Sequence, residues 1–341
     1  MSRARRDIAR NLRFTGSAVG WSLMAPRSPP EFSGPPLSLL PAERENLAMK
    51  IEKMLKRYRI ESGKKFSLKD HDPADTHGLD SEFKPQAKQM LVNGVQELSR
   101  LQNILAAQDR WGLLIILQAM DAAGKDGTIK HVMSGVNPQG VHVTSFKAPT
   151  PDELKHGFLW RTNLRSPARG EIGIFNRSYY EEVLVVRVHR AVLDNEKLPK
   201  QLVTKNIWEE RFEDINCLER YMTRNGIAVV KFFLHLSKKE QKRRFMERLD
   251  TADKNWKFSA ADVHERQYWD DYQTVYEDAI RHTATEHAPW YVVPADHKWF
   301  SRLVVAQAIV DALKGMELEY PKLTKEQKQA LEAARRELGK E

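Results

Sequence analysis

Short apolar segments alternate with longer amphipathic segments along most of the chain. Apolar or alternating runs predict five strands, at residues 113–117, 141–146, 171–175, 227–236 and 290–293. Apolar positions spaced three and four residues apart predict helices at residues 41–58, 85–110, 151–162, 200–225, 238–249, 260–285 and 299–313. Alternating strands and helices are typical of a parallel sheet with helices on both faces, so the predicted class is α/β.

The first predicted strand leads into a turn of small residues, 119–125, which ends in Lys125. Helical spacing resumes after the turn. Small residues let backbone N–H groups close around an anion, and a helix N-terminus adds partial positive charge. Strand, small-residue turn, lysine and helix in this order are typical of a phosphate-binding P-loop.

The turn departs from G-x-x-x-x-G-K-[ST] at two positions, because Ala119 replaces the first glycine and Asp126 replaces the Ser or Thr. Asp121 lies inside the turn, and together with Asp126 it offers the hard oxygen ligands that Mg²⁺ prefers. The alternative interpretation is an ordinary strand-to-helix turn with a solvated lysine.

Polar residues also follow the third predicted strand, and in parallel sheets ligands bind beyond the carboxyl ends of the strands. Arg177 can grip a phosphate with its fork of donors. The neutral Asn176 can hydrogen-bond a phosphate or a metal-bound water. Glu181 and Glu182 lie near enough in sequence to supply a carboxylate. An exposed Asn-Arg turn is the alternative.

A basic segment follows the fourth strand, at residues 238–257. It resembles the lid of a nucleoside monophosphate kinase, which closes over the transferring phosphoryl group and excludes water. A solvated basic helix face is the alternative, although three of its arginines are predicted to be functional. The predicted phosphate contacts of the loop, the strand ends and the lid are Ala122, Ala123, Gly124, Asp126, Gly127, Lys130, Lys147, Arg243, Arg244 and Arg248.

Composition narrows the class of protein. The 341 residues are 41% hydrophobic and 30% charged, which fits a soluble globular protein. No apolar run approaches the roughly 20 residues needed to span a bilayer. The single cysteine, Cys217, fits a reducing compartment, and we expect a cytoplasmic protein. The net charge of +9 indicates an acidic partner, which leaves nucleic acid, an anionic membrane surface and a polyphosphate-like polymer open.

Three segments are expected. Residues 1–40 are basic and rich in proline, which predicts a disordered extension, with a transit peptide as the alternative. Residues 41–315 form the predicted catalytic domain, whose lid covers about 238–285. Residues 316–341 are predicted to be a charged, helical tail.

The motifs at residues 120–127, 135–140, 146–150, 175–181 and 294–300 together resemble the polyphosphate kinase type 2 family, over roughly residues 45–315. The resemblance implies a thymidylate-kinase-like P-loop fold, with three layers, a five-stranded parallel sheet and a helical lid. It also implies phosphoryl transfer between inorganic polyphosphate and AMP, ADP or other purine nucleotides, with Mg²⁺. Dimers or tetramers are implied as well, and neither nucleic acid nor membrane is an expected partner.

Catalytic roles follow from the resemblance. Asp121 resembles the loop carboxylate that organises Mg²⁺, Lys125 the loop lysine, and Arg177 the phosphate-binding arginine. Asn176 stands where many members have Asp, as in the class III subgroup, whose members accept both AMP and ADP. This departure removes one metal ligand, and Glu182 is the predicted substitute.

Two rival functions remain open at this stage. An ATP-dependent nucleotide kinase can have the same fold. A nucleic-acid-binding protein would use the positive charge, but the chain shows no recognisable nucleic-acid motif and no aromatic residues interleaved with the basic run as stacking platforms.

Overall fold

The computed structural model describes residues 51–340, without the side chains of Lys254 and Lys257. The predicted extension, residues 1–40, and the start of the predicted 41–58 helix lie outside these residues. Residues 51–58 are helical. The following elements are, in chain order, β1 (Arg59–Ile60), α2 (Lys84–Gln108), β2 (Gly112–Gln118), α3 (Lys125–Val132), β3 (Val141–Ser145), α4 (Trp160–Asn163), β4 (Ile172–Asn176), α5 (Val185–Val188), α6 (Ala191–Asp194), α7 (Ile207–Arg224), β5 (Ile227–His235), α8 (Lys238–Asp250), α9 (Ala260–Glu265), α10 (Trp269–Thr283), β6 (Trp290–Pro294), α11 (Lys298–Lys314) and α12 (Lys325–Leu338).

The sheet of the described chain has six strands in the order β1-β6-β5-β2-β4-β3. The five predicted strands are all present and pair in parallel, with β2 between β5 and β4. The predicted count of five was one too low, because β1 pairs antiparallel with β6 at the edge. A two-residue strand is too short to show a period in the sequence.

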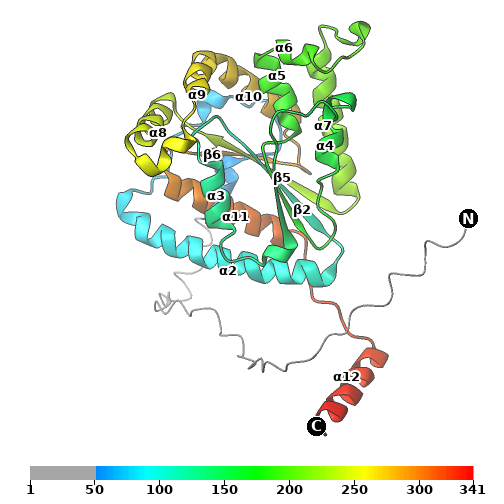
Figure 1. Ribbon diagram of the computed structural model, residues 1–341. Coiled ribbons are helices and arrows are strands. Elements are labelled where there is room, and N and C mark those ends of the chain that lie inside the picture. The colour runs from blue at the N-terminus through cyan, green and yellow to red at the C-terminus, as the bar shows by residue number, and fades with distance from the viewer. Residues whose placement is uncertain (1–50, 341) are drawn as a thin grey trace, which may run out of the picture. The chain divides into compact units, whose positions relative to one another are not determined.

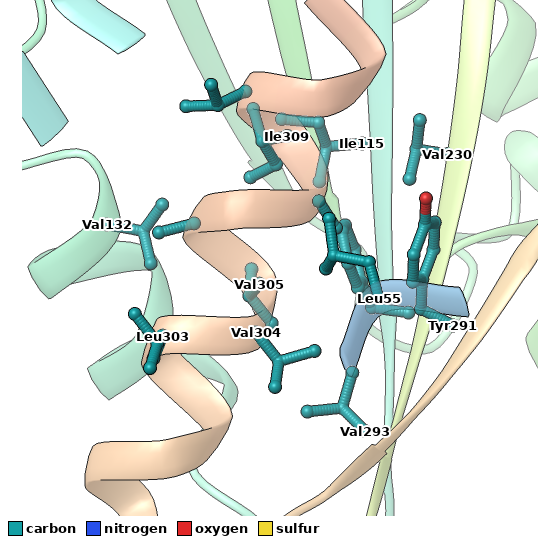
Figure 2. Close-up of a cluster of buried hydrophobic side chains, with 14 of the residues drawn as sticks. Leu55, Ile115, Val132, Val230, Tyr291, Val293, Leu303, Val304, Val305 and Ile309 are labelled. Atoms are coloured by element: carbon teal, nitrogen blue, oxygen red, sulfur yellow. The ribbon is translucent and has the colours of Figure 1, made fainter. Parts of the chain in front are cut away.

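Helices cover both faces of the sheet (Figure 1). Helices α2, α3 and α11 pack on one face, while α7 and α10 pack on the other. On the first face, Val304, Val305 and Ile309 of α11 lie against Ile115 and Val230 of the central strands (Figure 2). Alternate residues of β2 belong to the two cores, and for that reason this strand is one continuous apolar run.

Two predicted helices are interrupted. Most of 151–162 is turn, and only Trp160–Asn163 forms α4; Gly157 and the short 3₁₀ turn before it explain why the helical spacing is not followed. The predicted 260–285 helix divides into α9 and α10 around a 3₁₀ turn, Arg266–Tyr268.

Helix α7 begins at Ile207 and not at residue 200, since a 3₁₀ turn occupies Lys200–Leu202. The charged C-terminal segment contains α12, which starts with a capping box at Thr324 and buries none of its side chains. Within residues 51–340, every helix is too short or too polar to cross a membrane.

A buried ion pair lies under the second face of the sheet. Lys231 of β5 and Glu219 of α7 are both fully buried, and the Lys231 ammonium donates to Glu219 and to the Thr283 carbonyl. The Tyr179 and Tyr180 hydroxyls donate to the other carboxylate oxygen of Glu219, at 2.9 and 2.8 Å. The pair therefore anchors α7 and the segment after β4 to the middle of β5.

We expect Lys231→Met to lower the free energy of unfolding by about 3–5 kcal/mol, because it leaves the Glu219 carboxylate buried without its cation. Urea titration of the purified protein measures this change. The matched control is Lys56→Met. Lys56 forms an exposed ion pair with Glu52, and its loss should lower the free energy of unfolding by less than about 1 kcal/mol. Equal effects of the two substitutions would contradict the prediction.

Candidate functional site

The loop between β2 and α3 is shaped by two residues in the left-handed region. Ala122 has φ 62° and Gly124 has φ 106°. Glycine adopts this geometry without a steric cost, whereas a residue with a Cβ pays roughly 1–2 kcal/mol. Ala119, the residue in place of the first glycine, does not have a positive φ, so its methyl group is compatible with the turn. Ala122 therefore has a strained backbone conformation, and such conformations are concentrated at functional sites in proteins.

Lys125 reaches back across the loop, where its ammonium donates to the Ala119 carbonyl at 2.8 Å. Burial and the charge of Arg177 lower the pKa of Lys125, while Asp121 and Glu181 oppose that shift. A half-buried cation thus lies at the loop, close to the charges of Asp121 and Arg177.

Arg177 connects the loop to the segment after β4. Its guanidinium lies 3.2 Å from Asp121 and 3.4 Å from Glu181. Burial would lower the pKa of Arg177, but Glu181 and Asp121 outweigh it, and the net direction is upward. The backbone of Arg177 is left-handed, with φ 64°, and its N–H donates to the Leu117 carbonyl of β2. Asp121, Lys125 and Arg177 are therefore brought together.

Asn176, the last residue of β4, lies beside the first turn of α3. Its amide donates to Asp126 at 2.8 Å. Asn176, Arg177 and the predicted Lys147 line a common pocket of about 310 Å³. Lys130 is exposed and lines neither this pocket nor the two described below.

The structure does not bring Glu182 to the loop, which corrects its prediction as a metal ligand. Glu182 is buried and lies 3.2 Å from Arg211, whose other nitrogen contacts Glu196. Burial and the neighbouring Glu196 raise the pKa of Glu182 to about 7. The adjacent Glu181 faces the loop instead, fixed by Gln118 at 2.9 Å. The two acids are consecutive and no periodic signal distinguishes them, since the 3₁₀ turn at Tyr179–Val183 decides which one points inward.

A pocket of about 260 Å³ opens between the loop and the lid helices, and we call it the acidic pocket. Four carboxylates contribute to its lining, as do Arg177, Arg266 and His189. Apolar and aromatic side chains complete the wall. The carboxylates are Asp121, Glu181, Asp262 and Glu265, and the apolar and aromatic residues are Ala119, Met120, Val185, Tyr272 and Tyr276. The lining can accommodate both a planar ring and charged groups.

Of the predicted lid arginines, Arg244 has a different environment from the one expected. It is 4% exposed, and its guanidinium donates to the carbonyls of Ala122 and Ala123 at 3.0 and 2.8 Å. It also donates to the carbonyls of Ala295 and Asp296 after β6. Because these carbonyls and Glu240 occupy its donors, Arg244 shapes the phosphate loop and does not present its charge to solvent.

The two remaining predicted lid arginines differ from each other. Arg243 is exposed and pairs with Glu240 and Glu247 on its own helix, and it lines neither the acidic pocket nor the pocket that Arg248 lines. Arg248 lies 3.7 Å from Asp262 of α9 and lines a pocket behind the loop.

That second pocket, which we call the basic pocket, has a volume of about 210 Å³. Its lining includes loop residues and the cations Arg244, Arg248, Lys298 and Arg302. Burial and the charge of Arg244 lower the pKa of both Lys298 and Arg302. This crowding of cations is typical of a site for a polyanion. Lys298 and Arg302 were not predicted, although two basic residues one helical turn apart after the last strand are a readable signal.

Asp296, just after β6, holds the start of the lid. Its carboxylate accepts from the N–H and the hydroxyl of Ser237, at 2.8 and 2.7 Å. The Ser237 hydroxyl in turn caps α8 by accepting from Glu240. The Asp296 N–H donates to the Pro73 carbonyl at 3.0 Å. One residue therefore joins the last strand, the lid helix and the loop before α2.

Comparison with known proteins gives matches over most of the chain. The family model for polyphosphate kinase 2 matches residues 82–321, well over half of the chain. The ADP-polyphosphate phosphotransferase of Rhodopseudomonas palustris is 50% identical over 260 residues, which are 76% of this chain and 90% of that protein. The AMP/ADP-polyphosphate phosphotransferase of Meiothermus ruber is 45% identical over 267 residues, which are 78% and 96% of the two chains.

Solved structures give the same result for the fold. The crystal structure of polyphosphate kinase 2 from Arthrobacter aurescens TC1 superposes with a TM-score of 0.73 at 42% identity, and the match covers 81% of this chain and 95% of that chain. The two chains are therefore similar in sequence as well as in fold.

The raised pKa of Glu182 predicts a pH-dependent stability. Between its ordinary pKa of 4.5 and its value of about 7, the folded protein holds this proton more tightly than the unfolded chain. The free energy of unfolding should therefore fall as pH rises through this range, by about 3 kcal/mol from this group. Urea titrations at pH 5, 6, 7 and 8 measure it. In the Glu182→Gln variant the free energy of unfolding should depend less on pH. An unchanged pH dependence in that variant would contradict the raised pKa of Glu182.

The contacts of Arg244 predict that Arg244→Ala destabilises the protein by about 2–4 kcal/mol, because four carbonyl oxygens lose a buried charged donor. Arg243→Ala, one position earlier and exposed, should change stability by less than about 0.5 kcal/mol. Thermal and urea unfolding of both variants provide the comparison. A stable Arg244→Ala protein would show that the loop does not depend on this side chain.

Proposed function

The chain belongs to the polyphosphate kinase 2 family, and from this premise we propose that it transfers phosphoryl groups from inorganic polyphosphate to AMP and to ADP. The two relatives described above act on ADP, or on AMP and ADP, according to their names. Asn176, in the position that resembles the class III subgroup, supports the broader acceptor range.

The observation that carries this proposal is the contrast between the two pockets that meet at the phosphate loop. The basic pocket has Arg244, Arg248, Lys298 and Arg302 in its lining and one acid, Glu247. The acidic pocket has aromatic and apolar walls beside its charged groups. A polymer of phosphates suits the first pocket and a nucleotide suits the second, with the loop between them.

Mg²⁺ fits the residues present, and Asp121 and Glu181 are the carboxylates that would hold it. Both line the acidic pocket, and one guanidinium contacts both. Among residues 51–340, no group of three or more His, Cys, Asp or Glu side chains is arranged to hold a metal, so phosphate oxygens would complete the ligand set, as is usual for Mg²⁺. The bound ion would neutralise charge on the phosphates.

The chain's own residues then act by position and charge. Phosphoryl transfer needs little covalent chemistry from a protein, and its rate depends on alignment and electrostatic stabilisation. Lys125 and the loop amides bind the phosphate oxygens, and Arg177 orients Asp121 while carrying positive charge itself. Arg244 keeps the loop carbonyls pointed away from the anion, because it holds those of Ala122 and Ala123.

The decisive test is an assay of the purified protein with polyphosphate, AMP and Mg²⁺ in the absence of ATP. We expect ADP to form first and ATP after it, as measured by chromatography. No product should form when EDTA replaces Mg²⁺. Lys125→Ala and Asp121→Asn should each lower kcat/KM on the order of a thousandfold, because each removes a charge that positions the phosphates.

Circular dichroism and the melting temperature serve as controls that both variants remain folded. Phosphorylation of AMP by ATP alone, with no product from polyphosphate, would instead favour an ATP-dependent kinase of the same fold. Activity near wild type in either variant would overturn the assigned site.

A further inference from the structure

A third pocket lies where residues 57–75 meet the carboxyl ends of β5 and β6. Its volume is about 220 Å³, room for roughly seven water molecules. It shares no lining residue with the acidic pocket or the basic pocket. We call it the histidine pocket, since His71 and His235 both line it. The proposed phosphoryl transfer makes no use of it.

His235, the last residue of β5, leaves one ring nitrogen of this region unpaired. The residue is 5% exposed, and its Nδ1 is buried without a hydrogen-bond partner among residues 51–340. Burial lowers the pKa of His235 to about 4, so the ring is neutral at pH 7. With its proton on Nε2, a neutral imidazole presents Nδ1 as an acceptor. A buried acceptor of this kind calls for a donor from outside the chain.

Two carboxylates of the histidine pocket lack a counter-ion. In the described part of the chain, the Asp70 carboxylate makes no hydrogen bond or ion pair. The carboxylate of Asp72 accepts only from a backbone N–H two residues ahead, at 2.8 Å. Asp75 differs, because Arg57 contacts it at 2.7 Å. One arginine therefore balances one of three acids, and two negative charges remain.

Each of the two uncompensated acids lies near one imidazole. Burial lowers the pKa of His71, and the charge of Asp70 opposes this shift. The charge of Asp72 opposes the corresponding shift at His235. The histidine pocket thus offers acceptors and negative charge at two places, which disfavours an anion such as phosphate.

An alkylammonium ion meets these requirements better than a metal ion. An ammonium brings positive charge and several N–H donors, which form short hydrogen bonds to carboxylates. Among residues 51–340, no three His, Cys, Asp or Glu side chains are arranged to hold a metal. Val292 and Pro294 complete the wall with apolar surface, against which methylene groups can pack.

We propose that the histidine pocket binds a small aliphatic diamine. One ammonium donates to Asp72 and to His235 Nδ1, the other donates to Asp70, and the methylene chain lies along Val292 and Pro294. The bound diamine bridges the 70–75 segment and the strand ends, and so it stabilises the folded chain. This inference does not rest on the proposed function.

The test is calorimetric titration and thermal unfolding of the full chain with 1,4-diaminobutane. Polyphosphate is left out, because a polyanion would itself bind the amine. We expect a Kd on the order of 0.1 mM. A large excess of the diamine over Kd should raise the melting temperature by several degrees. Butane-1,4-diol has the same chain without charge, and tetramethylammonium has charge without N–H donors, so neither should produce this rise.

Two variants locate the site. Asp70→Asn combined with Asp72→Asn removes both charges from exposed side chains and should weaken diaminobutane binding at least about tenfold. His235→Phe keeps a ring but removes the acceptor, and should weaken binding about tenfold. The matched control combines Glu209→Gln with Glu210→Gln, which removes two charges from exposed acids of α7 outside the histidine pocket. It should leave Kd unchanged. If His235→Phe does not fold, the Asp70 and Asp72 variant decides.

Four results would overturn the proposal. They are no binding of diaminobutane at ten millimolar, an equal rise in melting temperature with tetramethylammonium or with MgCl₂ alone, an unchanged Kd in the Asp70 and Asp72 variant, and an equal loss of affinity in the control variant. None of them depends on phosphoryl transfer, so a failure here and a failure of the proposed function are distinguishable.

Discussion

One buried guanidinium holds the working parts of this structure in place. Arg244 starts from the lid helix α8 and donates to backbone carbonyls of the phosphate loop and of the segment after β6. A buried charge is costly unless its donors are satisfied, and here carbonyl dipoles and Glu240 satisfy them. The loop conformation, including the left-handed Ala122, is therefore determined partly by a residue more than 120 positions away.

This arrangement explains how the loop can serve two pockets of different character. The loop carbonyls of Ala122 and Ala123 face Arg244, and its acid Asp121 faces Arg177. Cations of α8 and α11 gather on one side of the loop. Carboxylates and aromatic rings gather on the other. Both sets of side chains belong to loops and helices that follow the parallel strands, and the carboxyl ends of these strands lie at one edge of the sheet.

Much of the fold could be read from the sequence, because the central strands are buried on both faces and appear as unbroken apolar runs. The loop from Ala119 to Lys125 was predictable for the same reason, as its small residues follow such a run. The site was predictable only where a residue's identity decides its role, as for Lys125 and Arg177. Orientation decided the others: Glu181 faces the pocket while Glu182 pairs with Arg211, and basic spacing gave no sign that Arg244 would be buried.

The bonds of Asp296 to Ser237 have a mechanical consequence. Since Asp296 is itself tied to Pro73 and to Arg244, the first turn of α8 is clamped to the body of the domain from several directions. Gln241 and Arg244, further along α8, are bonded to the phosphate loop as well, so a lid movement that keeps these bonds must begin beyond Arg244. The displacement in such a movement grows with distance from Arg244, so that the residues farthest along the lid move most.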